Sequence, residues 1–421
     1  MRLPGPPQAR LAWVVTLVGA VGFGVVAALL VPWQPVPGGM PDPVPAREVF
    51  TAAQIARAED FARLARALSW TALVISLLVA ALLGFTPRGA RLLDLAPGAV
   101  RRRWPLAVVF LVAVVLLIGR LATLVPGVLL QRQRLANDLS NQAWGDWALD
   151  QLRGYGVAVV ATSIALLVLV GCARRWPRWW PVIAAGLSAL LVLAGSFLYP
   201  LLVEPVFNNF HRMPDGQLRT EILRLADQEG VTVDDVLVAD ASRRTTTLNA
   251  YVSGFGSTRR VVVYDTLLDS QPEGEVLSVV AHELAHARHD DVVVGTVLGA
   301  FGAVVGVGVL GVLLASPGLR RRAGVTGLGD PRSVALVLAL LAVGTLLSSP
   351  VQNGISRRIE TRADVDALET TQDPESFIAL QRALALRSLA DPSPPAWSQF
   401  WFGSHPTALE RIAVARSLPI R

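Results

Sequence analysis

Residues 279–295 read VVAHELAHARHDDVVVG, and this stretch joins a histidine-rich motif to an apolar run. It holds three of the five histidines in the chain. His282 and His286 are four residues apart, so in a helix both imidazoles lie on one face and can share one zinc ion. Glu283 then lies beside the open coordination position, where it can take a proton from water. HELAH is therefore interpreted as part of a zinc site, and the alternative is a helix with two incidental histidines.

The geometry of a helix excludes His289 as the third ligand. His289 follows His282 by seven residues, which is about 10.5 Å along a helix, and zinc–nitrogen bonds near 2.0–2.1 Å cannot bridge that distance. In the longer metzincin motif a third histidine would stand at residue 292, which is Val292. Asp290 and Asp291 lie at or past the helix end, where we expect them to cap charge, orient a ligand or mark the membrane boundary. The third ligand must come from elsewhere.

A second polar segment, SRRIETRADVDALE at residues 356–369, supplies a candidate. Glu360 and Asp364 are one helical turn apart. Glu360 can complete a His–His–Glu ligand set that leaves a fourth position for water, and Asp364 can support a ligating histidine. The alternative is a solvated helix in which Arg358 and Arg362 pair with these carboxylates.

Seven apolar runs indicate a membrane protein, because each is near or above the roughly 18–20 residues that cross a bilayer. They lie at residues 11–32, 69–85, 104–129, 155–172, 180–203, 292–316 and 333–350. Tryptophans stand at the ends of runs, where interfacial aromatic residues are enriched: Trp33, Trp70, Trp104, Trp176, Trp179 and Trp180. The first run exceeds the apolar core of a signal peptide, so we expect a retained anchor.

Composition supports a membrane protein. Of the 421 residues 52% are hydrophobic and only 17% are charged, below the roughly 25% of soluble domains. The net charge of +6 arises from arginine without lysine. Because the arginines cluster between apolar runs, they indicate topology and not a nucleic-acid surface. The single cysteine, Cys172, excludes an intrachain disulfide framework.

Arginine density predicts an orientation. The linkers 86–103, 173–179 and 317–332 carry five, three and four arginines, whereas the linkers 33–68 and 130–154 carry four in 36 residues and three in 25. If all seven runs span, the first three linkers share one side. The positive-inside rule then places the N-terminus in the cytoplasm and the HELAH segment outside.

The runs divide the chain into four regions. We expect five transmembrane helices in 1–203, one half of a zinc domain in 204–291, a transmembrane hairpin in 292–350 and the other half in 351–421. Within 204–291, a helix is predicted with Asp215 as its N-cap, followed by strands near 236–240, 249–255 and 259–265 and a helix from about Glu273. The expected fold class is a mainly α, polytopic membrane protein with a small α+β zincin-like domain.

Five motifs in order resemble those of the type I CAAX prenyl endopeptidases, which are seven-span membrane zinc metalloproteases. The motifs are EPVFNNFHRMPDG (204–216), TLNAYVSGFGSTRRVVVYDTLL (247–268), HELAHARHDD (282–291), SRRIETRAD (356–364) and SHPTALERI (404–412). The resemblance runs from about residue 50 to the end of the chain. It implies a ring of tilted spans around an intramembrane chamber, closed at one end by the zinc domain.

The resemblance also implies roles for single residues. It makes Glu360 the third ligand of one zinc ion per chain and Asp364 its supporting carboxylate. It places the strand edge Asn249–Ala250–Tyr251 against substrate backbone, which agrees with strand addition as a peptide-binding mode. It gives His405 a place near the transition-state oxygen.

The expected function is a zinc endopeptidase that hydrolyses membrane-associated or prenyl-protein-like peptides entering the chamber from the bilayer, with Glu283 as general base. Two alternatives are a catalytically inactive membrane scaffold and a transporter with a coincidental HExxH motif. The arginine-rich, lysine-free composition indicates a bacterial plasma membrane. In the eukaryotic relatives the zinc domain faces the cytosol, whereas the arginine distribution places it outside. The oligomeric state stays open.

One aromatic segment admits two readings. DPSPPAWSQFWFGSHP (391–406) brings Trp397, Phe400, Trp401 and Phe402 next to the histidine of the last motif. These side chains can anchor the segment at the membrane interface, or they can form a gate over the chamber.

Overall fold

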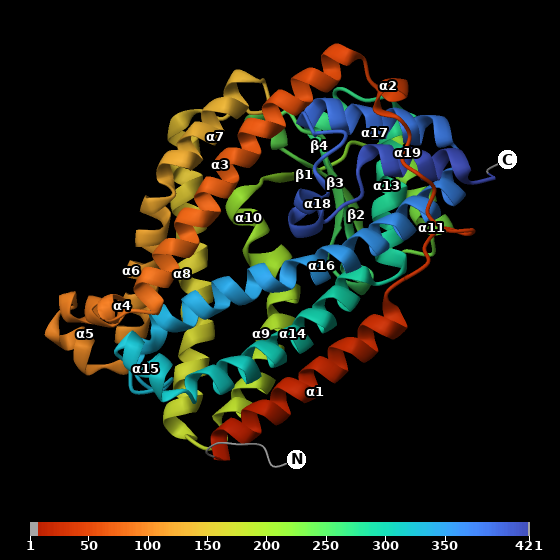
Figure 1. Ribbon diagram of the computed structural model, residues 1–421. Helices are drawn as coiled ribbons and strands as arrows, with labels where there is room; N and C mark the ends of the chain where they lie inside the picture. The colour runs from red at the N-terminus through yellow and green to blue at the C-terminus, as the bar shows by residue number, and fades with distance from the viewer. Residues whose placement is uncertain (1–6, 420–421) are drawn as a thin grey trace.

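Seven long apolar helices form most of the computed structural model, which describes residues 7–419 (Figure 1). Within these residues seven helices are long and apolar enough to cross a membrane. They are α1 (Pro7–Leu30), α3 (Ala52–Gly84), α6 (Trp104–Ala122), α8 (Trp144–Arg175), α9 (Trp180–Leu202), α14 (Asp291–Leu314) and α16 (Val334–Thr371). Each contains or overlaps one of the seven predicted runs, so the polytopic, mainly α fold class is confirmed.

Shorter helices connect the spans and build the domain at one end of the molecule. They are α2 (Ala46–Val49), α4 (Pro87–Arg91), α5 (Gly98–Arg102), α7 (Leu124–Ala136), α10 (Glu204–Phe207), α11 (Gln217–Gln228), α12 (Asp265–Leu268), α13 (Glu273–Arg288), α15 (Pro317–Ala323), α17 (Pro374–Ser388), α18 (Ala396–Phe402) and α19 (Ala408–Ser417). Single 3₁₀ turns lie at Leu92–Leu95, Ala241–Arg243, Gly256–Thr258 and Pro331–Ser333.

A four-stranded sheet with the order β1-β2-β4-β3 lies in this domain. Its strands are β1 (Phe210–Arg212), β2 (Asp235–Ala239), β3 (Ala250–Ser253) and β4 (Arg260–Tyr264). β2 and β4 are parallel, and β1 and β3 pair antiparallel to them at the two edges. The three predicted strands are present within a residue or two of their expected bounds, and β1 is an addition.

The predicted cap of α11 is wrong by one residue. The helix begins at Gln217, and its N-cap is Gly216, whose extended backbone offers no side-chain cap. Asp215 instead lies 3.8 and 3.9 Å from the guanidinium groups of Arg212 and Arg219. Competition from these cations explains why the Asp215 carboxylate does not cap the helix.

The third predicted run, 104–129, is divided between two helices. α6 ends at Ala122 and α7 starts at Leu124, with Thr123 between them outside helical geometry. Pro126 has no N–H to continue the hydrogen-bond ladder of α6. The crossing is therefore shorter than the run, and α7 packs along α3.

α16 continues beyond the apolar run that predicts it. Its ladder passes through Pro350, which cannot donate a hydrogen bond to the carbonyl of Leu346. The Ser349 hydroxyl donates to that carbonyl instead, at 2.8 Å. The helix therefore reaches Thr371, and the boundary expected at residue 350 lies inside it.

The linkers group at the two ends of the molecule as the topology argument requires. At one end Arg332 forms an ion pair with Asp94 at 3.0 Å, and Arg174 donates to the Gly329 carbonyl at 2.8 Å. These contacts join the three arginine-rich linkers to one another. At the other end Ser140 donates to the Arg244 carbonyl at 2.8 Å, which attaches the linker 130–154 to the domain that holds the sheet.

The spans surround a cavity of about 1830 Å³, called the chamber from here on. Residues of α1, α8, α9, α14 and α16 line its sides, and residues of β3, α13 and α17 line its end. In Figure 1 the domain with the sheet covers this end of the helices. The large chamber implied by the family resemblance is therefore part of the fold.

Candidate metal centre

The HELAH motif lies in α13, whose sequence explains its helical start and its buried position. Glu273 and Glu275 stand in the first turn, where acidic side chains complement the helix dipole. Val280, Ala281 and Leu284 are fully buried in the core that joins α13 to the sheet. This packing turns the opposite face, with His282 and His286, toward α16.

Two imidazoles and one carboxylate converge between α13 and α16. The Nε2 atoms of His282 and His286 lie 3.2 Å apart, and Glu360 oxygens lie 3.3 and 3.7 Å from them. Ligands around a tetrahedral zinc ion stand about 3.3 Å from one another. The spacing and the donor types of these three residues therefore fit a zinc ion. His282, His286 and Glu360 together are called the metal cluster from here on.

A carboxylate holds the other nitrogen of each imidazole. Asp364 Oδ1 lies 2.9 Å from His282 Nδ1, and Asp291 Oδ2 lies 2.9 Å from His286 Nδ1. These contacts fix the rings with Nε2 directed into the metal cluster, as outer carboxylates do in known zinc sites. The structure thus brings Asp364 to the predicted place and gives Asp291 the ligand-orienting position.

Two arginines support the carboxylates in turn. Arg411 of α19 forms a two-pronged contact with Asp364, with Nε 2.8 Å from Oδ2, and Arg362 pairs with the other carboxylate, Asp291. Guanidinium groups suit such fixed, paired contacts. Neither arginine was predicted as part of the site. Arg411 lies in the last family motif, 47 residues from Asp364 in the sequence. Its contact with Asp364 is visible only once the fold brings the two helices together.

The alternative of a solvated helix at 356–369 is contradicted by burial. Glu360 is 9% exposed and Asp364 is 0% exposed. His289 lies outside the metal cluster, as predicted, and pairs with Asp366 at 2.7 Å. α13 ends at Arg288, and the left-handed Asp290 turns the chain into the membrane span α14.

Burial and charge shift the acid–base properties of α13. Burial alone would lower the pKa of His282, but hydrogen bonds to Asp364 and Glu360 outweigh it and raise the pKa to about 10 in the metal-free protein. Burial raises the pKa of the Glu283 carboxyl above its usual range, and the two histidines of the motif partly offset the rise. Glu283 lines the chamber beside the metal cluster.

His405 also reaches the site. Its Nδ1 lies 2.8 Å from Glu360 Oε2, and 62% of its side chain is exposed. The carbonyl of His405 accepts a hydrogen bond from Gln399 at 2.7 Å, and Gln399 in turn lies in α18. Asn353 and Arg357 of α16 donate to carbonyl groups at the end of α18. These bonds hold the His405 loop against the helix that carries Glu360.

The edge strand β3 faces the chamber. In the part of the chain that the structure describes, β3 pairs with β4 alone, with Ala250 opposite Val263 and Tyr251 opposite Val262. Asn249, Ala250 and Tyr251 all line the chamber. The structure therefore brings the three predicted substrate residues to the edge beside the metal cluster, and burial raises the pKa of the Tyr251 hydroxyl.

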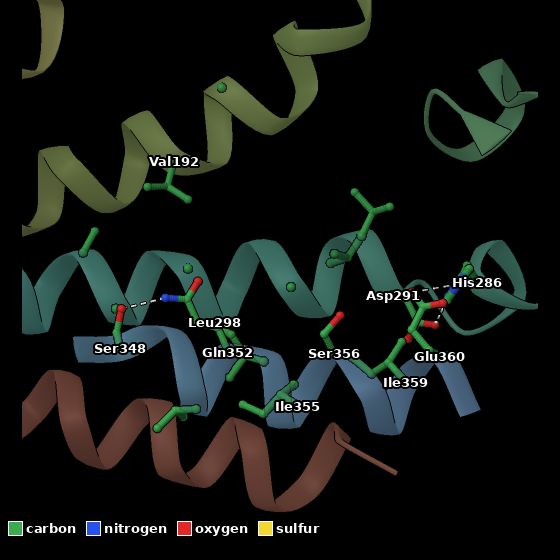
Figure 2. Close-up of a pocket in the computed structure, with 18 of the residues that line it drawn as sticks. Val192, His286, Asp291, Leu298, Ser348, Gln352, Ile355, Ser356, Ile359 and Glu360 are labelled. Atoms are coloured by element: carbon green, nitrogen blue, oxygen red, sulfur yellow. Dashed lines mark hydrogen bonds and ion pairs between the residues drawn. The ribbon is translucent and has the colours of Figure 1, made fainter. Parts of the chain in front are cut away.

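The chamber wall is mainly apolar, with one polar row. Figure 2 shows Ser348, Gln352 and Ser356 along α16, leading one turn at a time to Glu360. Apolar residues of neighbouring helices, such as Val192 of α9 and Leu298 of α14, also line the chamber. An extended chain that enters along α16 would meet both hydrogen-bonding groups and apolar surface.

The aromatic segment favours the anchor reading. Trp397 of α18 packs on Trp70 of α3 with ring centroids 4.2 Å apart. Trp397, Phe400 and Phe402 remain about half exposed. Of the residues that the structure describes, those lining the chamber do not include the four aromatic side chains of this segment. Within the described residues 391–406, His405 lines the chamber, whereas the aromatic side chains pack outside its lining, as an anchor would.

Comparison with known proteins finds sequence similarity to metalloproteases. The profile of peptidase family M48 matches residues 212–418. The uncharacterized metalloprotease YhfN of Bacillus subtilis is 28% identical over 277 residues, 65% of each chain. A CAAX prenyl protease 1 homolog of Oryza sativa is 27% identical over 268 residues, 63% of this chain and 62% of that one. The chain thus spans just under two thirds of the length of these curated relatives.

The fold as a whole has a solved counterpart. The crystal structure of S. mikatae Ste24p matches with a TM-score of 0.79 at 16% identity, covering 99% of this chain and 100% of the other. At this identity the likeness shows a shared fold. The sequence matches make the chain similar to the type I CAAX prenyl endopeptidases, and its residues 212–418 match peptidase family M48.

Proposed function

We propose that the protein is a membrane-embedded zinc endopeptidase that hydrolyses peptide bonds of membrane-associated substrates. One observation carries the proposal: the two Nε2 atoms of HELAH and the Glu360 carboxylate converge at the end of the chamber, with Glu283 beside them. The comparisons support the proposal, since relatives with similar sequences are named as metalloproteases and CAAX prenyl proteases.

His282, His286 and Glu360 would hold the metal ion. Bound by these residues, zinc would supply Lewis-acid chemistry, namely a lowered pKa of a water molecule and polarisation of a carbonyl group. Asp364 and Asp291 keep both imidazoles in the orientation that binding requires.

Glu283 moves the proton in this proposal. Its carboxylate takes a proton from the attacking water and passes it to the nitrogen of the leaving amine. Burial raises the pKa of the Glu283 carboxyl above its usual range. A raised pKa makes the carboxylate a stronger base toward the proton of the attacking water.

β3 and His405 would place the substrate. The unpaired edge of β3 can bind an extended peptide by main-chain hydrogen bonds. His405 stands at the mouth of the cluster on the Glu360 side, where a protonated or neutral imidazole can donate to the oxygen of the tetrahedral transition state. The apolar chamber wall suits a substrate with a lipid-like or apolar portion, such as a prenyl-protein-like peptide.

Comparing membrane fractions of cells with wild-type protein and with Glu283→Gln tests this function. We expect uncut substrates to accumulate in the variant. The new peptide termini found only with the wild-type protein identify the substrate and the side of the membrane on which it is cut. Identical peptide termini in both fractions would instead favour the inactive-scaffold alternative. A metal-free protein after gentle extraction would also favour that alternative.

A further inference from the structure

Two buried polar side chains near the metal cluster have no partner. Ser278 is 1% exposed and Gln381 is 2% exposed. The hydroxyl of Ser278 and the amide nitrogen of Gln381 make no hydrogen bond to any residue in the described range 7–419. Buried polar groups are almost always hydrogen-bonded, so each exception calls for an explanation.

Ser278 lacks the hydrogen bond to its own helix that other serines and threonines of this chain make. A serine or threonine inside a helix usually donates to the carbonyl four residues earlier, as Thr361, Thr371 and Ser388 do at 2.7–2.8 Å. The Ser278 hydroxyl makes no such bond although it lies in the middle of α13. Its hydrogen-bonding capacity is therefore left for a group outside its own helix.

Gln381 interrupts an otherwise apolar helix face. On α17 the residues Phe377, Leu380 and Leu384 share its face at helical spacing, and all of them line the chamber. α17 packs directly on α13. A leucine at position 381 would complete the core at no desolvation cost, so an unpaired amide here is unfavourable unless something binds it.

Both side chains are among those that line the chamber. Where α17 packs on α13, the lining includes Leu267, Ser278, Phe377, Leu380, Gln381 and Leu384. Ser278 precedes His282 by four residues, so it lies on the same face of α13, about 6 Å along the axis. Two residues of an extended peptide cover about the same length. A substrate side chain next to the scissile bond can therefore point toward this part of the lining.

We propose that Ser278 and Gln381 form the polar floor of a specificity pocket for one substrate residue. The pocket selects a compact, neutral side chain that both donates and accepts hydrogen bonds, such as asparagine, serine or threonine. The apolar walls and complete burial exclude charged side chains, because an unpaired charge there would lose its hydration. This inference rests on the proposed peptidase function and adds to it the class of residue at one position.

Cleavage of a positional peptide series tests the pocket. Peptides carry asparagine, threonine, valine or leucine at each position flanking the scissile bond, and kcat/KM is measured by mass spectrometry. For the wild type we expect a preference of about tenfold or more for the polar residues at one position, since a site built to hydrogen-bond rejects an analogue that cannot. Ser278→Ala and Gln381→Met should each remove most of that preference.

Ser163→Ala is the matched control. Ser163 is also a buried serine without a partner, but it lies in α8 and is not among the residues that line the chamber. This variant should keep wild-type ratios. Both pocket variants should unfold near the wild-type temperature. If Gln381→Met fails to fold, Ser278→Ala still tests the pocket, because it removes only the hydroxyl oxygen.

The outcomes separate the pocket from the peptidase function. Cleavage with wild-type ratios in both pocket variants, or no preference at any position in the wild type, overturns the pocket and leaves the function intact. If the wild-type protein cleaves no peptide, calorimetry measures the binding of the same peptides and tests the pocket instead. Tighter binding of the polar series than of the apolar series, lost in Gln381→Met, supports the pocket, and equal binding contradicts it.

Discussion

Asp291 is the first residue of a membrane span, and its carboxylate orients His286. Asp291→Asn keeps the shape but removes the charge that Arg362 and the imidazole share. We expect zinc affinity to fall about 10- to 100-fold, the usual cost of losing a supporting carboxylate. Chelator competition measures it. Asp290→Asn is the control, because Asp290 is exposed and pairs with Arg259. Equal affinity for both variants would contradict the role of Asp291.

Metal binding should depend on pH through His282. Its pKa is raised to about 10 in the metal-free protein, and only the neutral imidazole binds zinc. Below pH 10 the metal must displace a proton, so affinity should fall about tenfold for each unit that the pH decreases. Apparent zinc affinities at pH 6, 7 and 8 measure the slope. A flat profile over this range would show that His282 is already neutral.

At the residue scale the sequence predicted the candidate ligands but only part of their support. His282 and His286 follow from the HELAH spacing because helical periodicity places i and i+4 residues on one face. The roles of Glu360 and Asp364 were implied by the family resemblance. The arginine that holds Asp364 comes from α19. No local periodicity connects two helices so far apart in the chain, and only the fold supplies that contact.

At the element scale, close packing of α1 on α14 depends on glycine. A Cβ atom at Gly308 would lie 2.4 Å from the Thr16 hydroxyl and 2.6 Å from the Thr16 backbone nitrogen. Gly308→Ala should therefore separate the two helices at a cost of about 1–3 kcal/mol. The apparent unfolding temperature in detergent should fall. Gly24→Ala on α1, where a Cβ meets nothing within 4 Å, should not lower it. Equal temperatures would mean that α1 moves freely.

Hydropathy predicted the spans well and their ends poorly. Hydropathy measures how apolar a segment is, so it recovered all seven crossings. It did not divide the run 104–129 at Thr123, and it did not extend the last run past Pro350. Helix ends depend on single hydrogen bonds, such as the one from Ser349 to the Leu346 carbonyl. β1 was missed because three residues, with two exposed side chains, carry no alternating pattern.

At the scale of the whole molecule, the arginine-rich linkers lie together at the end opposite the metal cluster (Figure 1). The positive-inside rule then predicts that the metal cluster faces away from the cytoplasm. Single cysteines at Ser417 and Ser316, both exposed, report the two ends after Cys172→Ala. An impermeant thiol reagent should label the cysteine at 417 in intact cells and spare that at 316. The reverse pattern would place the site on the cytoplasmic side.

The whole arrangement follows from one long helix. α16 runs from the arginine-rich end, along the chamber, to the metal cluster, so a single element positions the polar row and the third ligand. From the sequence we expect a span and a separate ligand helix. Their continuity could not be read from composition, because the apolar and polar halves of α16 look like different kinds of segment.

We propose that Glu283 moves a proton while His282, His286 and Glu360 hold the metal. Zinc content and peptide cleavage of purified Glu283→Gln and Glu360→Ala proteins test these roles, with Glu369→Ala as an exposed control on α16. We expect one zinc ion per chain and a loss of cleavage by at least about 100-fold in Glu283→Gln, loss of zinc in Glu360→Ala, and wild-type behaviour in the control. Cleavage by Glu283→Gln at the wild-type rate would show that Glu283 does not move the proton.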